Sequence, residues 1–273
     1  MYLIASTKLR RARENLIGTQ PYFNALRTEI SRAFESPDRT KSPYVQNDGA
    51  ENGQGVCGCL VLTADRGLAG AFNQNIGKEV LRFKQAHEST RFFVLGQWGR
   101  QFFKTKELEC DGSFDFDNQE PSMDFARTVG ARLLDCFDSG EIQNLYIIYT
   151  EMNGMALSVN TVEVLPLRKE QLGGDEKGKE IRFEPSADAV INYAVPGYVT
   201  GYIYSAMIEN FCSEQNSRVA AMDYASDNAQ ELLDRLLSEY NHERQSSITQ
   251  EITEVSAGAR ARLKHIKEAQ SDK

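Results

Sequence analysis

The chain has 273 residues, of which 41% are hydrophobic and 26% charged, and a formal net charge of −8. This acidic balance argues against a nucleic-acid-binding protein, because neutralising a phosphate backbone takes grouped lysines and arginines. No apolar run approaches the roughly 18 residues of a membrane-spanning helix. The first residues also differ from a signal peptide, since their charges follow a short apolar patch instead of preceding it. We therefore expect the protein to remain inside the cell.

Cysteines and histidines indicate neither a disulfide framework nor a metal site. The five cysteines are an odd number and widely spaced, and the three histidines lie far apart without paired carboxylates at ligand spacing. We expect reduced, mostly buried thiols and no cofactor. These residues are Cys57, Cys59, Cys110, Cys136 and Cys212, with His87, His242 and His265.

Residues 1–34 are predicted to form the N-terminal helix of a coiled coil. Leu9, Leu16, Phe23 and Ile30 recur every seven residues, which is the spacing of a coiled-coil seam. Its expected partner is the C-terminal helix. Gly18 and Pro21 are expected to weaken or bend it. The helix has no capping residue, so either it begins at the terminus or residues are missing in front of it.

The same segment is basic within an acidic protein, with six basic residues against two acidic ones. One interpretation is an ordinary solvated helix face, which such charge runs usually are. The alternative is a surface that docks on an acidic partner.

Residues 35–55 read as a linker rich in Pro, Gly, Asn and Asp, and residues 56–185 as an α/β body. Strands that alternate with helices predict a Rossmann-like, mainly parallel sheet, and a final alternating segment predicts a hairpin or edge strand. The expected strands are 56–63, 91–95, 112–116, 144–150, 155–167 and 180–183, and the expected helices run from about 72 to 86, 97 to 106 and 121 to 137.

Residues 186–273 are predicted to be mostly helical. The helix should start at Ala187, be interrupted at Pro196, Gly197 and Gly201, and then run without a break from 202 to 257, roughly 80 Å. Its apolar seam stops at a polar stretch, residues 241–247, that must face something other than a packed core. The fold class expected is an α/β body inserted between terminal helices that form an antiparallel coiled coil.

The best enzymatic candidate is the strand, turn and helix at residues 56–71. Gly67 and Gly70 stand where a backbone could approach a phosphate. However, neither a dinucleotide fingerprint nor a P-loop is present, and no catalytic motif appears elsewhere. Asp65 and Arg66 fit an ion pair or a helix cap better than an acid/base couple.

Several motifs resemble the gamma subunit of the F-type ATP synthase. Residues 61–73, VLTADRGLAGAFN, are similar to its strand and D-R-G-L-C/A-G turn, and residues 5–12 to its A-[AS]-x-K-[LM]-R-[RK]-A segment. Residues 213–229 match its S-E-x-x-x-R-x-x-A-M signature, and residues 240–254 its Y-N-x-x-R-Q stretch. The matches run in order over nearly the whole chain.

The resemblance implies a non-catalytic rotor shaft that couples ion flow across a membrane to ATP synthesis or hydrolysis. Its implied partners are the alpha and beta subunits of the catalytic ring, the epsilon subunit and the ring of c subunits. The resemblance also implies a peripheral location on the cytoplasmic side of the cell membrane. The implied contact residues are Arg244, Gln245 and Thr249 towards the ring, Lys8, Arg10 and Arg11 towards acidic beta-subunit segments, and Glu184 at the foot near epsilon and the c ring.

Two departures from the family pattern stand out. Family members begin about two dozen residues earlier, so the sequence is expected to lack the usual N-terminal segment. Residues 258–267 form a cationic tail where the family tip is small and apolar. The alternatives that remain are an α/β nucleotide-binding enzyme with helical arms and a coiled-coil scaffold unrelated to ATP synthesis.

Overall fold

The computed structural model describes residues 2–34, 42–45, 55–112, 114, 120–153, 156–168, 183–184 and 186–271. The chain divides into two compact units, Met1–Met222 and Asp223–Lys273. The four-part division expected from the sequence stays a prediction.

The core of the first unit is a four-stranded sheet with the order β2-β1-β3-β4. Strands β1 (Cys57–Leu62), β2 (Thr90–Leu95) and β3 (Asn144–Asn153) are parallel, and β4 (Ala156–Leu165) pairs with β3 antiparallel. This arrangement confirms the mainly parallel sheet and the closing hairpin expected from the sequence.

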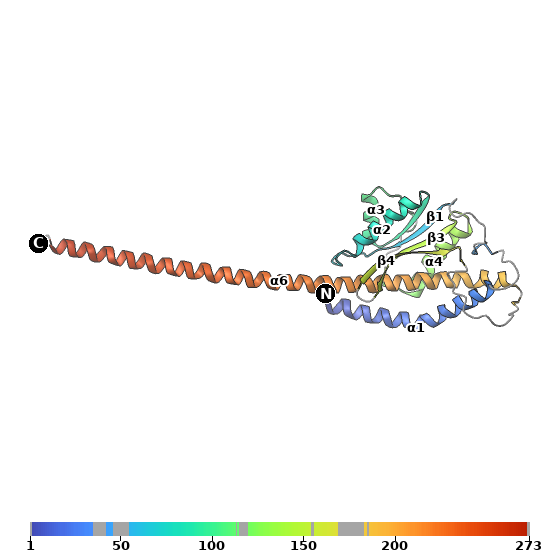
Figure 1. The fold of residues 1–273 in the computed structure, drawn as a ribbon, viewed down its shortest axis with the longest axis horizontal. Coiled ribbons are helices and arrows are strands. Elements are labelled where there is room, and N and C mark those ends of the chain that lie inside the picture. Colours follow the sequence, from blue (N-terminus) through green and yellow to red (C-terminus); the bar gives the residue numbers. More distant parts are fainter. Residues whose placement is uncertain are drawn as a thin grey trace. The chain divides into compact units, whose positions relative to one another are not determined.

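Helices cover both faces of the sheet (Figure 1). Helices α2 (Phe72–Ala86) and α3 (Gln97–Thr105) pack on one face, and α4 (Met123–Asp138) with the first part of α6 (Ala187–Ser271) packs on the other. All six residues of β1 are buried, because alternate side chains point into two different hydrophobic cores. For this reason β1 appears in the sequence as a continuous run of apolar and small residues.

Polar side chains cap the first turns of two helices, and a cap is one of the roles that the sequence predicted for Asp65. The Ser122 hydroxyl accepts a hydrogen bond from the Phe125 N–H at 3.2 Å and caps α4. Asp65 Oδ1 accepts one from the Gln97 N–H at 2.9 Å, at the start of α3. Asp65 is thus a helix cap and not half of an acid/base couple.

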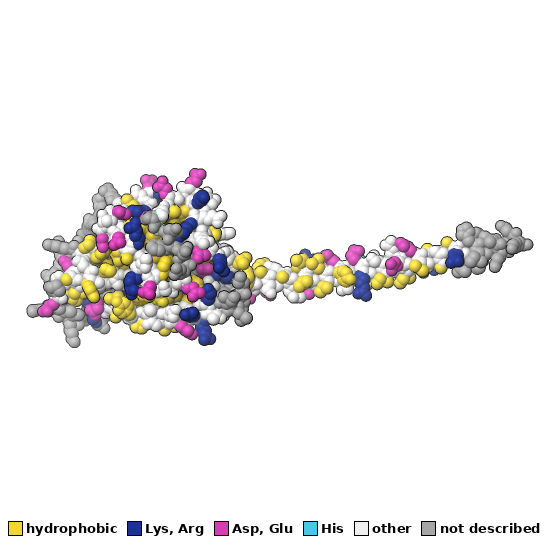
Figure 2. Space-filling view, turned by 180° about the vertical axis from the view of Figure 1, so that it is seen from behind, with side chains coloured by type: hydrophobic (Ala, Val, Ile, Leu, Met, Phe, Trp, Pro, Cys, Tyr) yellow, Lys and Arg dark blue, Asp and Glu magenta, His cyan; other side chains and the backbone are white. Residues whose placement is uncertain are grey.

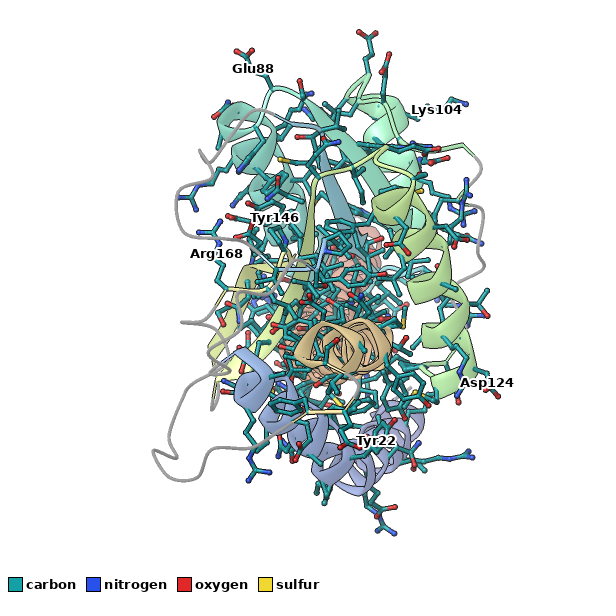
Figure 3. The ribbon with its side chains drawn as sticks, turned by 90° about the vertical axis from the view of Figure 1, so that its right-hand side faces the viewer. Tyr22, Glu88, Lys104, Asp124, Tyr146 and Arg168 are labelled. Atoms are coloured by element: carbon teal, nitrogen blue, oxygen red, sulfur yellow. The ribbon has the colours of Figure 1, made fainter. Side chains whose placement is uncertain are left out.

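Helix α1 (Tyr2–Phe34) lies antiparallel to the first part of α6. A Cβ at Gly201 would lie 1.9 Å from the Phe23 ring, and one at Gly197 would lie 3.4 Å from Leu26. Of the predicted seam, Ile30 is fully buried, and Leu9 and Phe23 are partly buried and pack against the same core. Figure 3 looks along α6 and shows α1, α4 and the sheet around it. The contact with α1 includes positions before the expected rod start at residue 202.

The expected interruption of the C-terminal helix is wrong. Helix α6 runs without a break from Ala187 through Pro196 to Ser271. A proline inside a helix leaves the carbonyl four residues earlier without its donor. Here that residue is Asn192, which is exposed, so water can replace the lost hydrogen bond. Helix α1 likewise continues through Pro21, with a gentle curve (Figure 1).

Other expectations fall partly outside the described residues. Residues 169–182, which include most of the strand expected at 180–183, lie outside them. Of the strand expected at 112–116, residues 113 and 115–116 also lie outside, and Gly112 is in a turn. In the expected linker, Tyr44 is buried and its hydroxyl donates to Asp138 at 2.7 Å. This part of the linker is therefore packed on the body.

Replacing Gly201 by alanine should destabilise the first unit by about 1 to 3 kcal/mol, because the new methyl group would overlap the Phe23 ring. The control is Gly18→Ala in α1, where nothing lies within 4 Å of the new carbon and higher helix propensity should stabilise the protein by up to about 1 kcal/mol. Urea unfolding of both variants measures the difference, and equal effects would contradict the close packing of α1 on α6.

Candidate functional site

The basic turn of α1 contacts the body through Lys8. Lys8 Nζ is 2.7 Å from Glu120 Oε1, and this hydrogen bond lowers the pKa of the Glu120 carboxyl. Arg10 forms a loose pair with Glu14 at 3.3 Å between largely exposed side chains, a contact of little energetic value. Arg11 is exposed. Arg10 and Arg11 are therefore exposed, whereas Lys8 also makes a direct contact with the body, and the charge of Arg11 further lowers the pKa of Glu120.

Near this turn, α6 carries a buried ion pair. Arg218 Nη2 is 2.6 Å from Glu214 Oε1, with side chains 13% and 9% exposed. Burial raises the pKa of Glu214, and the Arg218 guanidinium opposes that rise. The same guanidinium makes long contacts with the carbonyl oxygens of Arg66 and Gly67, at 3.4 and 3.5 Å. Arg218 thus joins α6 to the loop that follows β1.

A second carboxylate of α6, that of Glu209, is partly buried near another carboxylate, which disfavours its charged form. Burial and, to a smaller extent, the nearby charge of Glu151 on β3 raise the pKa of Glu209 to about 7, although the hydrogen bond with the Ser205 hydroxyl partly offsets both. Glu209 therefore changes charge near neutral pH within the contact between α6 and the hairpin of β3 and β4.

In the second unit, every side chain described from residue 223 to 262 is exposed. Hydrophobic side chains lie at the surface along this segment (Figure 2). An amphipathic helix normally covers its apolar stripe. The large apolar side chains that are 44 to 73% exposed here are Tyr224, Leu232, Leu233, Leu236, Leu237, Tyr240, Ile248, Ile252 and Val255.

The predicted ring contacts lie on two faces of this segment. Arg244 is four residues from Tyr240 and four from Ile248, so it stands within the apolar stripe. Gln245 and Thr249 share the next face, and the Thr249 hydroxyl donates to the Gln245 carbonyl oxygen at 2.8 Å. Within the stretch at 241–247, Arg244 thus lies in the apolar stripe and Gln245 lies on the polar face beside it.

The predicted foot residue lies far from the basic turn of α1. Glu184 is exposed just before α6 begins. Because α1 and α6 are antiparallel, Glu184 is at the other end of their contact from Lys8, a span of roughly 40 Å at 1.5 Å per helical residue. The structure does not bring these two predicted sites together.

The sequence reading did not find the polar contacts between α6 and the end of β3. Asn210 Oδ1 accepts a hydrogen bond from the Thr150 N–H at 3.0 Å, and the Ser213 hydroxyl donates to the Thr150 carbonyl oxygen at 3.1 Å. All three residues are buried. The available signal was the spacing of three between Asn210 and Ser213, which puts both on one face of the helix.

Across the described part of the chain, no group of three or more metal-ligating side chains gathers. No described helix combines the length and apolar character needed to cross a bilayer. The donors at the start of α3 are also used within the chain: the Gly99 N–H bonds to Thr63 Oγ1 at 3.0 Å and the Gln97 N–H bonds to Asp65.

Comparisons with known proteins agree over almost the whole chain. A family model described as ATP synthase matches residues 1–261. The ATP synthase gamma chain of Ruminiclostridium cellulolyticum is 35% identical over 269 residues, which cover 96% of this chain and 91% of the relative. The sodium ion specific gamma chain of Acetobacterium woodii is 31% identical over 280 residues, with the same two coverages.

Solved structures share the fold at lower identity. A chain of the Euglena gracilis mitochondrial ATP synthase aligns with a TM-score of 0.55 and 20% identity, covering 94% of this chain and 95% of its own length. A chain from the central stalk and c-ring structure of the Tetrahymena thermophila enzyme aligns with a TM-score of 0.54 and 20% identity, covering 83% and 97%. At this identity the likeness supports the fold.

Replacing Arg218 by alanine should destabilise the first unit by about 3 to 5 kcal/mol, because Glu214 would remain buried without its cation. The matched control is Arg127→Ala, which removes an exposed arginine paired with Asp124 and should change stability by less than about 1 kcal/mol. Urea unfolding at neutral pH compares the two, and equal small effects would show that the buried pair matters little.

Glu209→Gln should remove a pH dependence of folding. The folded chain binds the Glu209 proton more tightly than the unfolded chain, so its contribution to stability is complete below about pH 4.5 and is lost as pH rises through about 7. The free energy of unfolding of the variant, relative to that of the native chain, should therefore increase by about 2 kcal/mol between pH 4.5 and pH 8.

Unfolding by urea across this pH range measures the effect. The control is Glu88→Gln, since Glu88 points into solvent at the end of α2 (Figure 3). Parallel pH profiles for the native chain and Glu209→Gln would show that Glu209 does not titrate in this window.

Proposed function

The chain belongs to the family of ATP synthase gamma chains, and we propose that residues 223–262 of α6 are the part that engages the ring of alpha and beta subunits. As a gamma chain it is a non-catalytic subunit of the ATP synthase complex. Its work is to couple rotation to the state of catalytic sites on other chains. The finer assignments of partner and contact residue that follow are part of the proposal.

The observation that supports this proposal is the exposure of the whole segment. An isolated helix gains little stability from its own hydrogen bonds, and packing of its apolar face usually supplies the rest. Leu233, Leu237 and Ile248 leave about half of their side-chain surface in water. Burying one such side chain contributes on the order of 1.5 to 3 kcal/mol when it is complete. A partner that covers the stripe therefore stabilises the helix and gains affinity from it.

The two faces of the segment suggest how one helix can act on three similar catalytic sites. One face is apolar with Arg244 inside it, and the next presents Gln245 and Thr249 without charge. A turning helix would offer each surrounding subunit these faces in succession. A ligand shifts a conformational equilibrium only through different affinities for its states, and an asymmetric helix supplies such a difference at each orientation.

The remaining contacts divide between the two ends of the α1 and α6 pair. Arg10 and Arg11 can meet acidic segments of the beta subunit, while Lys8 keeps its contact with Glu120 and positions the turn. Glu184 can meet the epsilon subunit and the ring of c subunits, with the complex held peripherally on the cytoplasmic face of the cell membrane. Charge-assisted contacts act before close fit is reached, which suits partners that separate and meet again.

Changing Arg244 and Gln245 together to alanine should lower the rates of ATP synthesis and hydrolysis by the assembled complex about tenfold, because hydrogen bonds to charged groups contribute on the order of 1.5 to 3 kcal/mol. The helix itself should be unaffected, since both side chains are exposed and alanine favours helix. Both rates are measured on purified complex, with circular dichroism of the chain as a check on folding.

The matched control is the double variant Arg82→Ala with Gln85→Ala, which removes the same two chemical groups from exposed positions of α2 in the first unit, outside the segment proposed to engage the ring. It should retain most of the native activity. Equal rates in the native complex and the Arg244 and Gln245 variant would contradict the assignment, as would equal losses in both double variants.

A further inference from the structure

The end of β3 is completed by a helix instead of a strand. Strand β1 pairs with β3 as far as Val61 opposite Ile148. Beyond that point, none of the described strands lies beside the edge of β3 that faces β1, while β4 continues along the other edge. There the Thr150 N–H bonds to Asn210 Oδ1 at 3.0 Å, and the Thr150 carbonyl oxygen accepts from the Ser213 hydroxyl at 3.1 Å. Side chains of α6 thus take the place of the next residue of β1.

These two hydrogen bonds, here called the Thr150 clamp, are shielded from water. Thr150 is 2% exposed, Asn210 6% and Ser213 not at all. A buried backbone N–H or C=O that loses its partner costs far more than an exposed one, because water cannot replace the bond. The clamp therefore opposes any movement that separates its two sides.

The clamp also specifies one position of α6 on the sheet. Apolar packing is non-directional and tolerates small slips. By contrast, a shift of one residue along an α-helix moves a side chain by about 1.5 Å and turns it by about 100°. Either change would break both bonds with Thr150 at once. Rotation of α6 about its own axis is resisted in the same way.

We propose that the Thr150 clamp carries torque between α6 and the α/β body. This inference rests on the proposed function, since torque arises only if the chain turns inside a ring of subunits. Asn210, Ser213 and Thr150 act here as positioning residues, far from any reacting atom. The clamp should matter most when the rotor works against a load, because a slipping helix costs little when nothing opposes rotation.

The test uses the assembled ATP synthase complex in sealed vesicles. Two variants remove the clamp: Asn210→Leu with Ser213→Ala, and the milder Ser213→Ala alone in case the double variant does not fold. Hydrogen exchange of the Thr150 amide should speed up about tenfold in the double variant, the effect of losing one net hydrogen bond. ATP hydrolysis without an opposing gradient should stay near the native rate.

Against an established gradient of protons or sodium, ATP-driven uptake per assembled complex should fall roughly fivefold, at the low end of couplings between distant sites. Ser217→Ala is the matched control, because its buried hydroxyl donates to the Ser213 carbonyl oxygen of its own helix, at 2.8 Å, and takes no part in the clamp. It should pump like the native complex.

Three results would overturn the inference: native uptake under load in a variant whose Thr150 amide exchanges faster, a loss equal to that of Ser217→Ala, or a loss that follows the amount of assembled complex and not the load. The proposed function is checked separately by the native arm. If the native chain did not co-assemble with ring subunits, the proposed function would fail and this inference with it, whatever the amide exchange showed.

Discussion

The burial of the first part of α6 is the constraint on which the rest of the first unit depends. This part of the helix packs against the sheet, α4 and α1, and contributes fully buried side chains such as Ile191, Val195 and Val199. Without it, one face of the sheet and the seam of α1 would be open to water. The first part of α6 therefore contributes to the same hydrophobic core as the sheet, and α1 packs on this part. Both terminal helices are integral parts of the fold of the first unit.

Within that buried contact, several polar groups have specific partners. Glu214 meets Arg218, and Asn210 with Ser213 meets the backbone of Thr150. Apolar packing supplies most of the free energy of burial but does not choose between neighbouring registers. Directional hydrogen bonds do, because an unmet buried group is costly. The same helix is exposed from residue 223 to 262, where its side chains are free to meet other chains.

Periodicity predicted most of the architecture. The alternation of short apolar runs with helical segments was enough for the parallel sheet, and the seven-residue spacing was enough for the buried seam of α1. The interruption expected at Pro196 was wrong because a local rule took no account of exposure: Asn192, whose carbonyl loses its donor, lies at the surface. The contact at Gly197 and Gly201 was also missed, because glycines that admit Phe23 and Leu26 look in sequence like helix breakers.

By itself, the sequence determined the fold class, the family and the two helical surfaces with unusual charge, since these follow from patterns along the chain. Only the tertiary structure decided which polar residues face inward and what they meet. Lys8 pairs with Glu120, 112 positions away, and Asn210 with Thr150, 60 positions away. No spacing rule links residues so far apart, because their meeting depends on how the helices and the sheet pack. For the same reason, Lys8 and Arg10 look alike in sequence and differ in the folded chain.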